Sequence, residues 1–321
     1  MEIVTIEDNK NNVVIKHQEL IRTARYRLSE LGIKVVSVLV SMIKVSDADF
    51  QEYIIKVNDF KELIGSTSKK TYEYVDVMTD ELMKKPFKVG DEKFNWVYYA
   101  KYKEGDNAVV LKIAPELKPY LLNLKQNFLE YNIINILPLK SGYVIRLYEL
   151  CKDHYSEGTR YKKSNQSVTF DIKIERLREL FEIPKSYQYS SHIKKLILEK
   201  AAIQFKEKTD IQITYQEQKI GRKVDRVIIT VRENNKGSND YFKNRHAFIE
   251  HMRANFVNQD IYQGKDKHTG RFMKISIAPD GKLYDKTGHE FEASRSDEMW
   301  SSLFKLAQND QLLCLKQGTL F

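Results

Sequence analysis

Ten residues of one pattern occur twice in the chain, first as Ile55-Lys56-Val57-Asn58-Asp59-Phe60-Lys61-Glu62-Leu63-Ile64 and again as Ile172-Lys173-Ile174-Glu175-Arg176-Leu177-Arg178-Glu179-Leu180-Phe181. The shared pattern is I-K-[VI]-x-x-[FL]-[KR]-E-L and an apolar residue, and the copies lie 117 residues apart. A flanking stretch, Val109-Val110-Leu111-Lys112-Ile113, recurs at nearly the same offset as Val227-Ile228-Ile229-Thr230-Val231. Because the flanks agree as well, two copies of one module explain this part of the chain better than one large domain.

Both copies predict the same order of elements. Each opens with an apolar-periodic helix (residues 28–43 and 142–155), followed by a short strand (53–57 and 168–174) that leads into a short helix. A turn follows, at Gly65-Ser66-Thr67-Ser68 or Pro184-Lys185-Ser186, and then a longer helix (69–85 and 187–206). A β-hairpin closes each copy, turning at residues 104–107 and near Gly221. This order is that of a winged helix-turn-helix, whose recognition helix can enter the major groove of DNA.

The sequence therefore predicts an α+β fold in three parts. A first winged-helix domain is expected at residues 1–136, a second at 137–236, and a small α+β appendage at 237–321, after the polar linker 234–239. In the appendage we expect a helix at 241–256, strands near 272–277 and 281–284, and a second helix near 299–307. The apolar stripe of that second helix is predicted to be core rather than a partner groove; its members are Met299, Trp300, Leu303, Phe304 and Ala307. The sequence does not indicate what the appendage does.

Positive charge is concentrated in one third of the chain. Residues 137–236 carry 21 basic and 13 acidic side chains, a net charge of +8, whereas residues 1–136 carry zero net charge and 237–321 carry +1. A solvated lysine-rich surface is one interpretation of such a stretch, and an electrostatic footprint for nucleic acid is the other.

The predicted recognition helix at 187–206 has two faces. At 100° per residue, one face is apolar: Ile193, Leu196, Ile197, Ala201 and Phe205. The opposite face carries hydrogen-bonding and cationic groups: Gln188, Ser191, His192, Lys195, Ala202 and Lys206, with Lys194 on the flank. These groups suit base edges and phosphates, although an ordinary solvated face has the same composition. The following hairpin presents Lys219, Arg222 and Lys223 around Gly221, as expected of a wing tip that meets phosphate.

The matching helix of the first copy suits DNA less well. Its predicted outward face holds Lys69, Lys70, Glu73 and Tyr74, and its core stripe Tyr72, Val75, Met78 and Leu82. Further acids along this helix would repel phosphate: Asp76, Asp80 and Glu81. We therefore expect only auxiliary DNA contact here, through Lys69, Lys70 and Tyr74.

The chain shows no pattern of catalysis. It has neither G-x-x-x-x-G-K-[ST] nor G-x-G-x-x-G, its acids are scattered, and no cofactor or metal is expected. Cys151 and His154 have the spacing of helix neighbours, but two further metal ligands are missing, so a buried thiol and a surface imidazole are expected. Two cysteines far apart favour a reducing cytoplasm, and no apolar run approaches the ~20 residues of a membrane span. The N-terminal residues lack the apolar core of a secretory signal.

Several motifs resemble one family. Leu139-x-Ser141-x-Tyr143-x-x-Arg146-Leu147-Tyr148-Glu149-Leu150 resembles the opening of the second winged helix of iteron-binding plasmid replication initiators. The segments before it (residues 114–121, and Phe128-x-x-Tyr131) and the recognition helix (Tyr187, with 193–195 and Leu198) resemble the same family, as do the opening helices at 14–20 and 29–40. Together these segments span about residues 10–235. The recognition helix departs from the family, which is often richer in arginine, so base assignments do not transfer.

The resemblance implies two tandem winged helices that bind repeated origin sequences in double-stranded DNA as a monomer. It also implies a dimer, joined through the first domain, that represses its own promoter, and it implies the host initiator and the replicative helicase as partners. The first hairpin bears the aromatic residues Trp96, Tyr98, Tyr99 and Tyr102, which suit a protein interface or, alternatively, the interior of the module. Two other functions stay open: a tandem winged-helix transcriptional repressor without a replication role, and a metal-dependent nucleic-acid enzyme such as a primase or nuclease.

Overall fold

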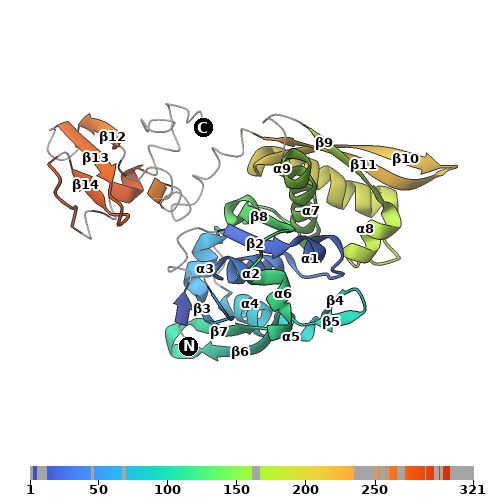
Figure 1. Cartoon of the computed structure of the whole chain (residues 1–321), viewed down its shortest axis with the longest axis horizontal. Helices are drawn as coiled ribbons and strands as arrows, with labels where there is room; N and C mark the ends of the chain where they lie inside the picture. Colours follow the sequence, from blue (N-terminus) through green and yellow to red (C-terminus); the bar gives the residue numbers. More distant parts are fainter. Residues whose placement is uncertain are drawn as a thin grey trace. The chain divides into compact units, whose positions relative to one another are not determined.

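The chain forms two compact units that divide between Ser238 and Asn239, inside the predicted linker. The structure, a computed structural model, describes residues 3–5, 13–44, 47–66, 70–160 and 167–234 of the first unit. In the second unit it describes residues 249, 252–253, 258, 260–265, 272–285, 287–292, 296 and 299–303. Figure 1 labels most of the helices and strands of both units.

The first winged helix is built around helix α2 (Glu30–Ser41), which is buried along almost its whole length. The helix begins at Ser29, whose hydroxyl accepts a hydrogen bond from the backbone nitrogen of Gly32 at 2.9 Å. Strand β3 (Glu52–Lys56) leads into α3 (Val57–Leu63), and the third helix follows in three parts: α4 (Thr71–Asp76), the π-helix η2 (Val77–Glu81) and α5 (Leu82–Lys84). The hairpin β6 (Val97–Lys103) and β7 (Ala108–Ile113) closes the module.

Smaller elements surround this module. Strand β1 (Ile3–Thr5) extends its sheet, in the order β1-β3-β7-β6. Strand β2 (Val13–His17) pairs with β8 (Phe128–Asn132), and β4 (Phe87–Val89) pairs with β5 (Glu92–Phe94). Helices α1 (Gln18–Arg22) and α6 (Lys118–Leu121) complete it, with short 3₁₀ turns η3 (Glu104–Asp106), η4 (Pro115–Leu117) and η5 (Ile133–Asn135).

The second winged helix repeats the same path. It comprises α7 (Gly142–Thr159), β9 (Val168–Lys173), α8 (Ile174–Leu180), the π-helix η6 (Tyr189–Glu199), α9 (Lys200–Lys208), β10 (Ile211–Ile220) and β11 (Lys223–Glu233). The repeat extends to the strand register, because Ile55 pairs with Val109 and Ile172 pairs with Val227. The predicted tandem modules, with their element order and hairpins, are confirmed.

Helix α7 joins the two winged helices. It packs on α1, α2 and β8 of the first copy and on β9, η6, α9 and β11 of the second, and one apolar core runs through both (Figure 1). At the start of α7 the backbone of the first copy comes close, since a Cβ atom on Gly142 would lie 2.6 Å from the carbonyl oxygen of Leu28. The position therefore requires glycine.

A buried ionic cluster fixes α7 against the first copy. The Lys16 ammonium lies 2.6 Å from Oε1 of Glu149, and the Tyr131 hydroxyl donates to the same oxygen at 2.7 Å. Arg146 lies 3.2 Å from Oε2 of Glu149 and donates to the carbonyl oxygen of Ala24 at 3.2 Å. Burial by itself would raise the pKa of Glu149, but the charges of Lys16 and Arg146, with hydrogen bonds from Lys16 and Tyr131, outweigh it and lower that pKa. Arg146 and Glu149 belong to the quoted Arg146-Leu147-Tyr148-Glu149 motif, so this motif connects the modules.

The C-terminal unit contains a three-stranded antiparallel sheet of β12 (Asp260–Lys265), β13 (Phe272–Ile277) and β14 (Leu283–Asp285). The two predicted strands are confirmed, with a turn at Gly281 (φ +79°) between them, whereas β12 was not predicted. Trp300 and Leu303 are buried in this unit's own core, as expected. Phe304, Ala307 and most of the helix predicted at 241–256 lie outside the described residues.

Candidate nucleic-acid interface

The recognition helix of the second module begins as a π-helix. Backbone hydrogen bonds in such a helix run from residue i to i+5, so each turn holds more residues than an α-helical turn. Ile193, Ile197 and Leu198 face the core, together with Ala201 and Phe205 of α9. The prediction that Leu196 belongs to this stripe is wrong, because its side chain is 40% exposed. The 100° step assumed an α-helix, and the wider π turns rotate Leu196 outward and Leu198 inward.

The outer face of η6 carries most of the predicted DNA-binding groups. Gln188, Ser191 and Lys195 are exposed, and His192 is half-buried. The imidazole of His192 stacks on Tyr187 with ring centroids 4.3 Å apart. Its Nδ1 accepts a hydrogen bond from the backbone nitrogen of Gln188 at 3.1 Å and lies 2.8 Å from the Ser191 hydroxyl. His192 thus caps the first turn, which leaves Lys195 and Gln188 as the extended polar side chains of this face.

Contacts of Arg178 and Lys194 hold the start of η6 in place. Arg178 of α8 donates hydrogen bonds to the carbonyl oxygens of Pro184 (3.1 Å) and Tyr187, so the turn is fixed to the preceding helix. Lys194 forms an ion pair with Glu217 of β10 at 2.7 Å, which ties the helix to the wing. A hydrogen bond and the charge of Glu217 raise the pKa of Lys194. Lys194 therefore holds the recognition helix against the wing and also adds positive charge to the site.

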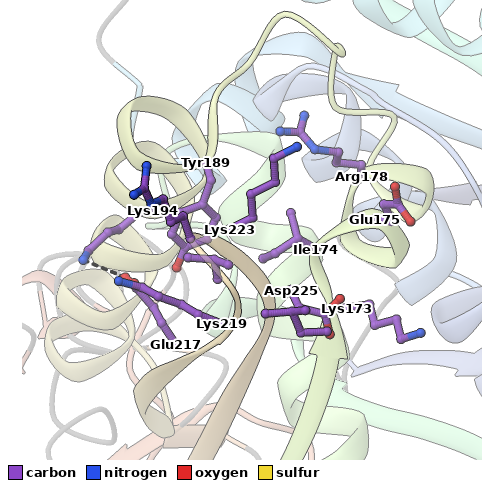
Figure 2. Close-up of a pocket in the computed structure, with 13 residues that line it drawn as sticks. Lys173, Ile174, Glu175, Arg178, Tyr189, Lys194, Glu217, Lys219, Lys223 and Asp225 are labelled. Carbon is purple, nitrogen blue, oxygen red and sulfur yellow. Dashed lines mark ion pairs between the residues drawn. The ribbon is translucent and has the colours of Figure 1, made fainter.

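A groove of about 760 Å³ lies between the helix start, the end of β9 and the wing (Figure 2). Its cationic lining residues are Lys173, Arg178, Lys194, Lys219, Arg222 and Lys223, and its acidic ones are Glu175, Glu217 and Asp225. The excess of cations gives the groove a positive potential suited to phosphate. The structure therefore brings Lys194 together with Lys219, Arg222 and Lys223, while Gln188, Ser191, His192 and Lys195 lie outside the groove's lining.

Sequence reasoning missed part of this groove. Lys173 and Arg178 occupy the second and seventh positions of the repeated ten residues, and Tyr189 and Ile220 also line the groove. The basic residue at each of these two repeat positions could have pointed to the groove. It was overlooked because the repeat was used only to align the two modules.

The third helix of the first module presents a different surface. The prediction that Tyr74 faces outward is wrong: its side chain is 5% exposed and packs edge-on against Phe60, with its hydroxyl hydrogen-bonded to Ser66. Tyr74, Met78 and Leu82 recur every fourth residue on the core side, the spacing of one helix face, whereas Val75 is only half-buried. Lys70 forms an ion pair with Glu73 at 3.0 Å, and Lys69 lies outside the described residues.

Two family models match the two winged helices. The model described as Initiator Replication protein, WH1 matches residues 13–152, and that described as Initiator Rep protein, WH2 matches residues 173–231. Together these matches cover more than half of the chain. The chain belongs to the initiator replication protein family. The first match extends into α7, as expected for a helix shared by both modules of this initiator.

A solved structure gives the same fold. The initiator is similar to the Pi initiator protein, whose crystal structure was determined in complex with iteron DNA. The two chains share 18% sequence identity with a TM-score of 0.55, over 71% of this chain and 99% of that chain. At this identity the similarity establishes tandem winged helices and leaves the DNA contacts of this initiator to its own side chains.

The aromatic residues of the first hairpin divide between interior and surface. Trp96 is buried and stacks on Phe87 with ring centroids 4.5 Å apart, as the interior alternative predicted. Tyr98 and Tyr99 of β6 are 52% and 39% exposed, and Tyr102 is half-buried. Among the described residues β6 is the edge strand of its sheet, so this initiator presents two tyrosines on a sheet edge.

Cys151 and His154, the pair with the spacing of helix neighbours, lie in surroundings typical of structural residues. Burial raises the pKa of the Cys151 thiol, and His154 stacks on Phe170 with ring centroids 4.0 Å apart. Within the described part of the initiator, no group of three or more His, Cys, Asp or Glu side chains could hold a metal ion. Nor is any helix among those residues long and apolar enough to cross a membrane.

Proposed function

We propose that this chain initiates plasmid replication by binding repeated origin sequences, iterons, in double-stranded DNA. The observation that carries the proposal is the positive groove beside an exposed polar helix start, both in the second winged helix. Membership of the initiator replication proteins and the likeness to an initiator crystallised with iteron DNA support the same function.

In this proposal residues 137–236 carry the main recognition. The start of η6 lies in the major groove, where Gln188, Ser191, His192 and Lys195 meet base edges. Lys219, Arg222 and Lys223 at the wing meet the phosphates beside it, and Lys194 adds charge at the junction. Lys69 and Lys70 of the first module give auxiliary backbone contact, whereas Tyr74 serves the core.

The first module, residues 1–136, also carries self-association in this proposal. The β6 edge with Tyr98 and Tyr99 is the surface that would join two copies into a dimer that represses its own promoter. Sedimentation of the full chain tests this part: Tyr98→Ser with Tyr99→Ser should remain monomeric at concentrations where the wild type self-associates, with DNA binding retained. Equal self-association of both proteins would contradict it.

Initiation further requires opening of the origin and recruitment of the host initiator and the replicative helicase. The proposal assigns these steps to the DNA-bound monomer. Within it the chain acts by binding and remodelling DNA, without chemistry of its own.

Footprinting on the DNA that flanks the gene tests the proposed function. The expected result is protection of several direct repeats of about two helical turns each, with the helix face and the wing covering adjacent grooves. Deletion of the repeats should abolish replication of a plasmid that depends on the chain. Protection of a single operator, with replication unaffected, would instead identify a transcriptional repressor.

A further inference from the structure

The wing of the second module projects beyond its sheet. Strand β9 pairs with β11 only as far as the pair Lys173 and Arg226, whereas β10 and β11 continue pairing to Ile220 and Lys223. Among the described residues the tip is therefore a ribbon of β10 and β11 alone, as Figure 1 shows. A register shift between Gln218 and Lys219 adds local twist to this ribbon. Gly221, with φ +61°, allows the tight turn at its end.

Ile220 stands at this tip with 70% of its surface exposed. No large hydrophobic side chain in the described part of the chain is more exposed, and hairpin tips normally carry polar residues. Cations surround it, since Lys219 precedes it, Lys223 is its cross-strand partner and Arg222 lies in the turn. A surface with one apolar side chain among cations can contact the phosphates of DNA and also the stacked bases between them.

We infer that Ile220 enters the minor groove next to the bound major groove and wedges into a base step there. This inference rests on the proposed function, because the recognition helix must first place the wing on the duplex. The minor groove is about 6 Å wide and 7.5 Å deep, so a narrow ribbon tip can present one side chain to its floor. Lys219, Arg222 and Lys223 then neutralise the phosphates on its walls. An apolar wedge partly unstacks the step and kinks the duplex, which gives the initiator a means of weakening origin DNA.

The test uses the full chain and a duplex containing one direct repeat from the DNA that flanks the gene. Adenines are replaced one at a time by 2-aminopurine, whose fluorescence rises when the base unstacks, and bending is followed by energy transfer between the duplex ends. The wild type should raise the fluorescence at one step beside the footprint and bend the duplex. Ile220→Ala should lose both signals while weakening binding by less than about tenfold, since the cost of unstacking offsets much of the gain from burying the side chain.

Matched variants isolate the wedge. Ile220→Met keeps an apolar wedge and should keep both signals. Ile203→Ala removes an equally apolar side chain that is 58% exposed on α9, outside the lining of the protein's positive groove, and it should change neither signal. Arg222→Ala should keep the fluorescence rise while lowering the salt dependence of binding. Retention of both signals by Ile220→Ala would overturn the inference and leave the proposed function intact, as would loss of self-association by Ile220→Ala without a change in DNA distortion. If the wild type does not prefer the repeat over a scrambled duplex, the proposed function fails, and the inference falls with it.

Discussion

The two winged helices follow one path through space but differ in the helix that would face DNA. The start of η6 exposes Gln188 and Lys195, whereas the matching part of the first module buries Tyr74 and pairs Lys70 with Glu73. The spacing of core residues and the strand register are the same in both copies, whereas the residues on the outer surface differ. A duplicated fold thus preserves what packing requires, and the surface chemistry of each copy decides whether it binds DNA.

The largest effect is expected in the core that the two modules share. Glu149→Gln leaves the charges of Lys16 and Arg146 buried without their carboxylate, so the free energy of unfolding should fall by about 3–5 kcal/mol. Glu149 has a lowered pKa in the folded state, so its contribution is present above its unfolded pKa of about 4.3 and is lost as the pH falls through the folded value. The wild type should therefore lose stability on acidification more steeply than the variant.

Urea unfolding at several pH values measures both effects. The matched control is Glu179→Gln, which breaks an exposed pair with Arg176 (3.1 Å) and should cost less than about 1 kcal/mol. A cost for Glu149→Gln no larger than that of the control would mean that the cluster does not hold the modules together.

A smaller effect is expected at the outer face of η6. Lys195→Ala removes a proposed base contact, so it should cost about 1–3 kcal/mol on a repeat duplex and much less on a scrambled one. The ratio of the two affinities should shrink accordingly, as measured by titration of both duplexes. An unchanged ratio would place base recognition elsewhere.

The smallest single effect is expected at the wing. Arg222→Ala removes a proposed phosphate contact, so it should weaken binding to both duplexes alike and lower the salt slope by about one. Titration at two salt concentrations gives this slope. Should Arg222→Ala collapse discrimination while Lys195→Ala does not, the roles of helix and wing are reversed.

The sequence predicted the topology because the repeat consists largely of core positions. Ile55 and Ile172 occupy equivalent places in their sheets, and the residue pattern around each of them predicts the strand and the helix that follows it. The helix faces were predicted less well. A period of 100° does not describe the π-helical turns of η6, so Leu196 was misplaced. Tyr74 was assigned to the outward face, although it lies on the core side with Met78 and Leu82. Long-range polar contacts escaped prediction altogether. Lys16 and Glu149 lie 133 residues apart, and no local pattern reveals that a lysine and a glutamate will be buried together.

The groove was predicted in part for a related reason. The wing cations Lys219, Arg222 and Lys223 surround a recognisable turn glycine, so their place at the tip followed from local sequence. Lys173 and Arg178 reach the groove only because β9 and α8 pack beside the wing, which is a tertiary arrangement. The role of the wing cations in DNA binding stays a prediction.

The salt dependence of binding by two charge-removal variants of the full chain tests most directly whether the second module dominates DNA contact. One variant carries Lys219→Ala, Arg222→Ala and Lys223→Ala in the second module; the other carries Lys70→Ala, Lys101→Ala and Lys103→Ala in the first, so both lose three positive charges. Each neutralised phosphate contributes about 0.9 to the slope of log affinity against log salt. The second-module variant should therefore lose roughly three units of slope, and the first-module variant less than about one. A first-module variant that flattens the slope as much as the second would contradict the account.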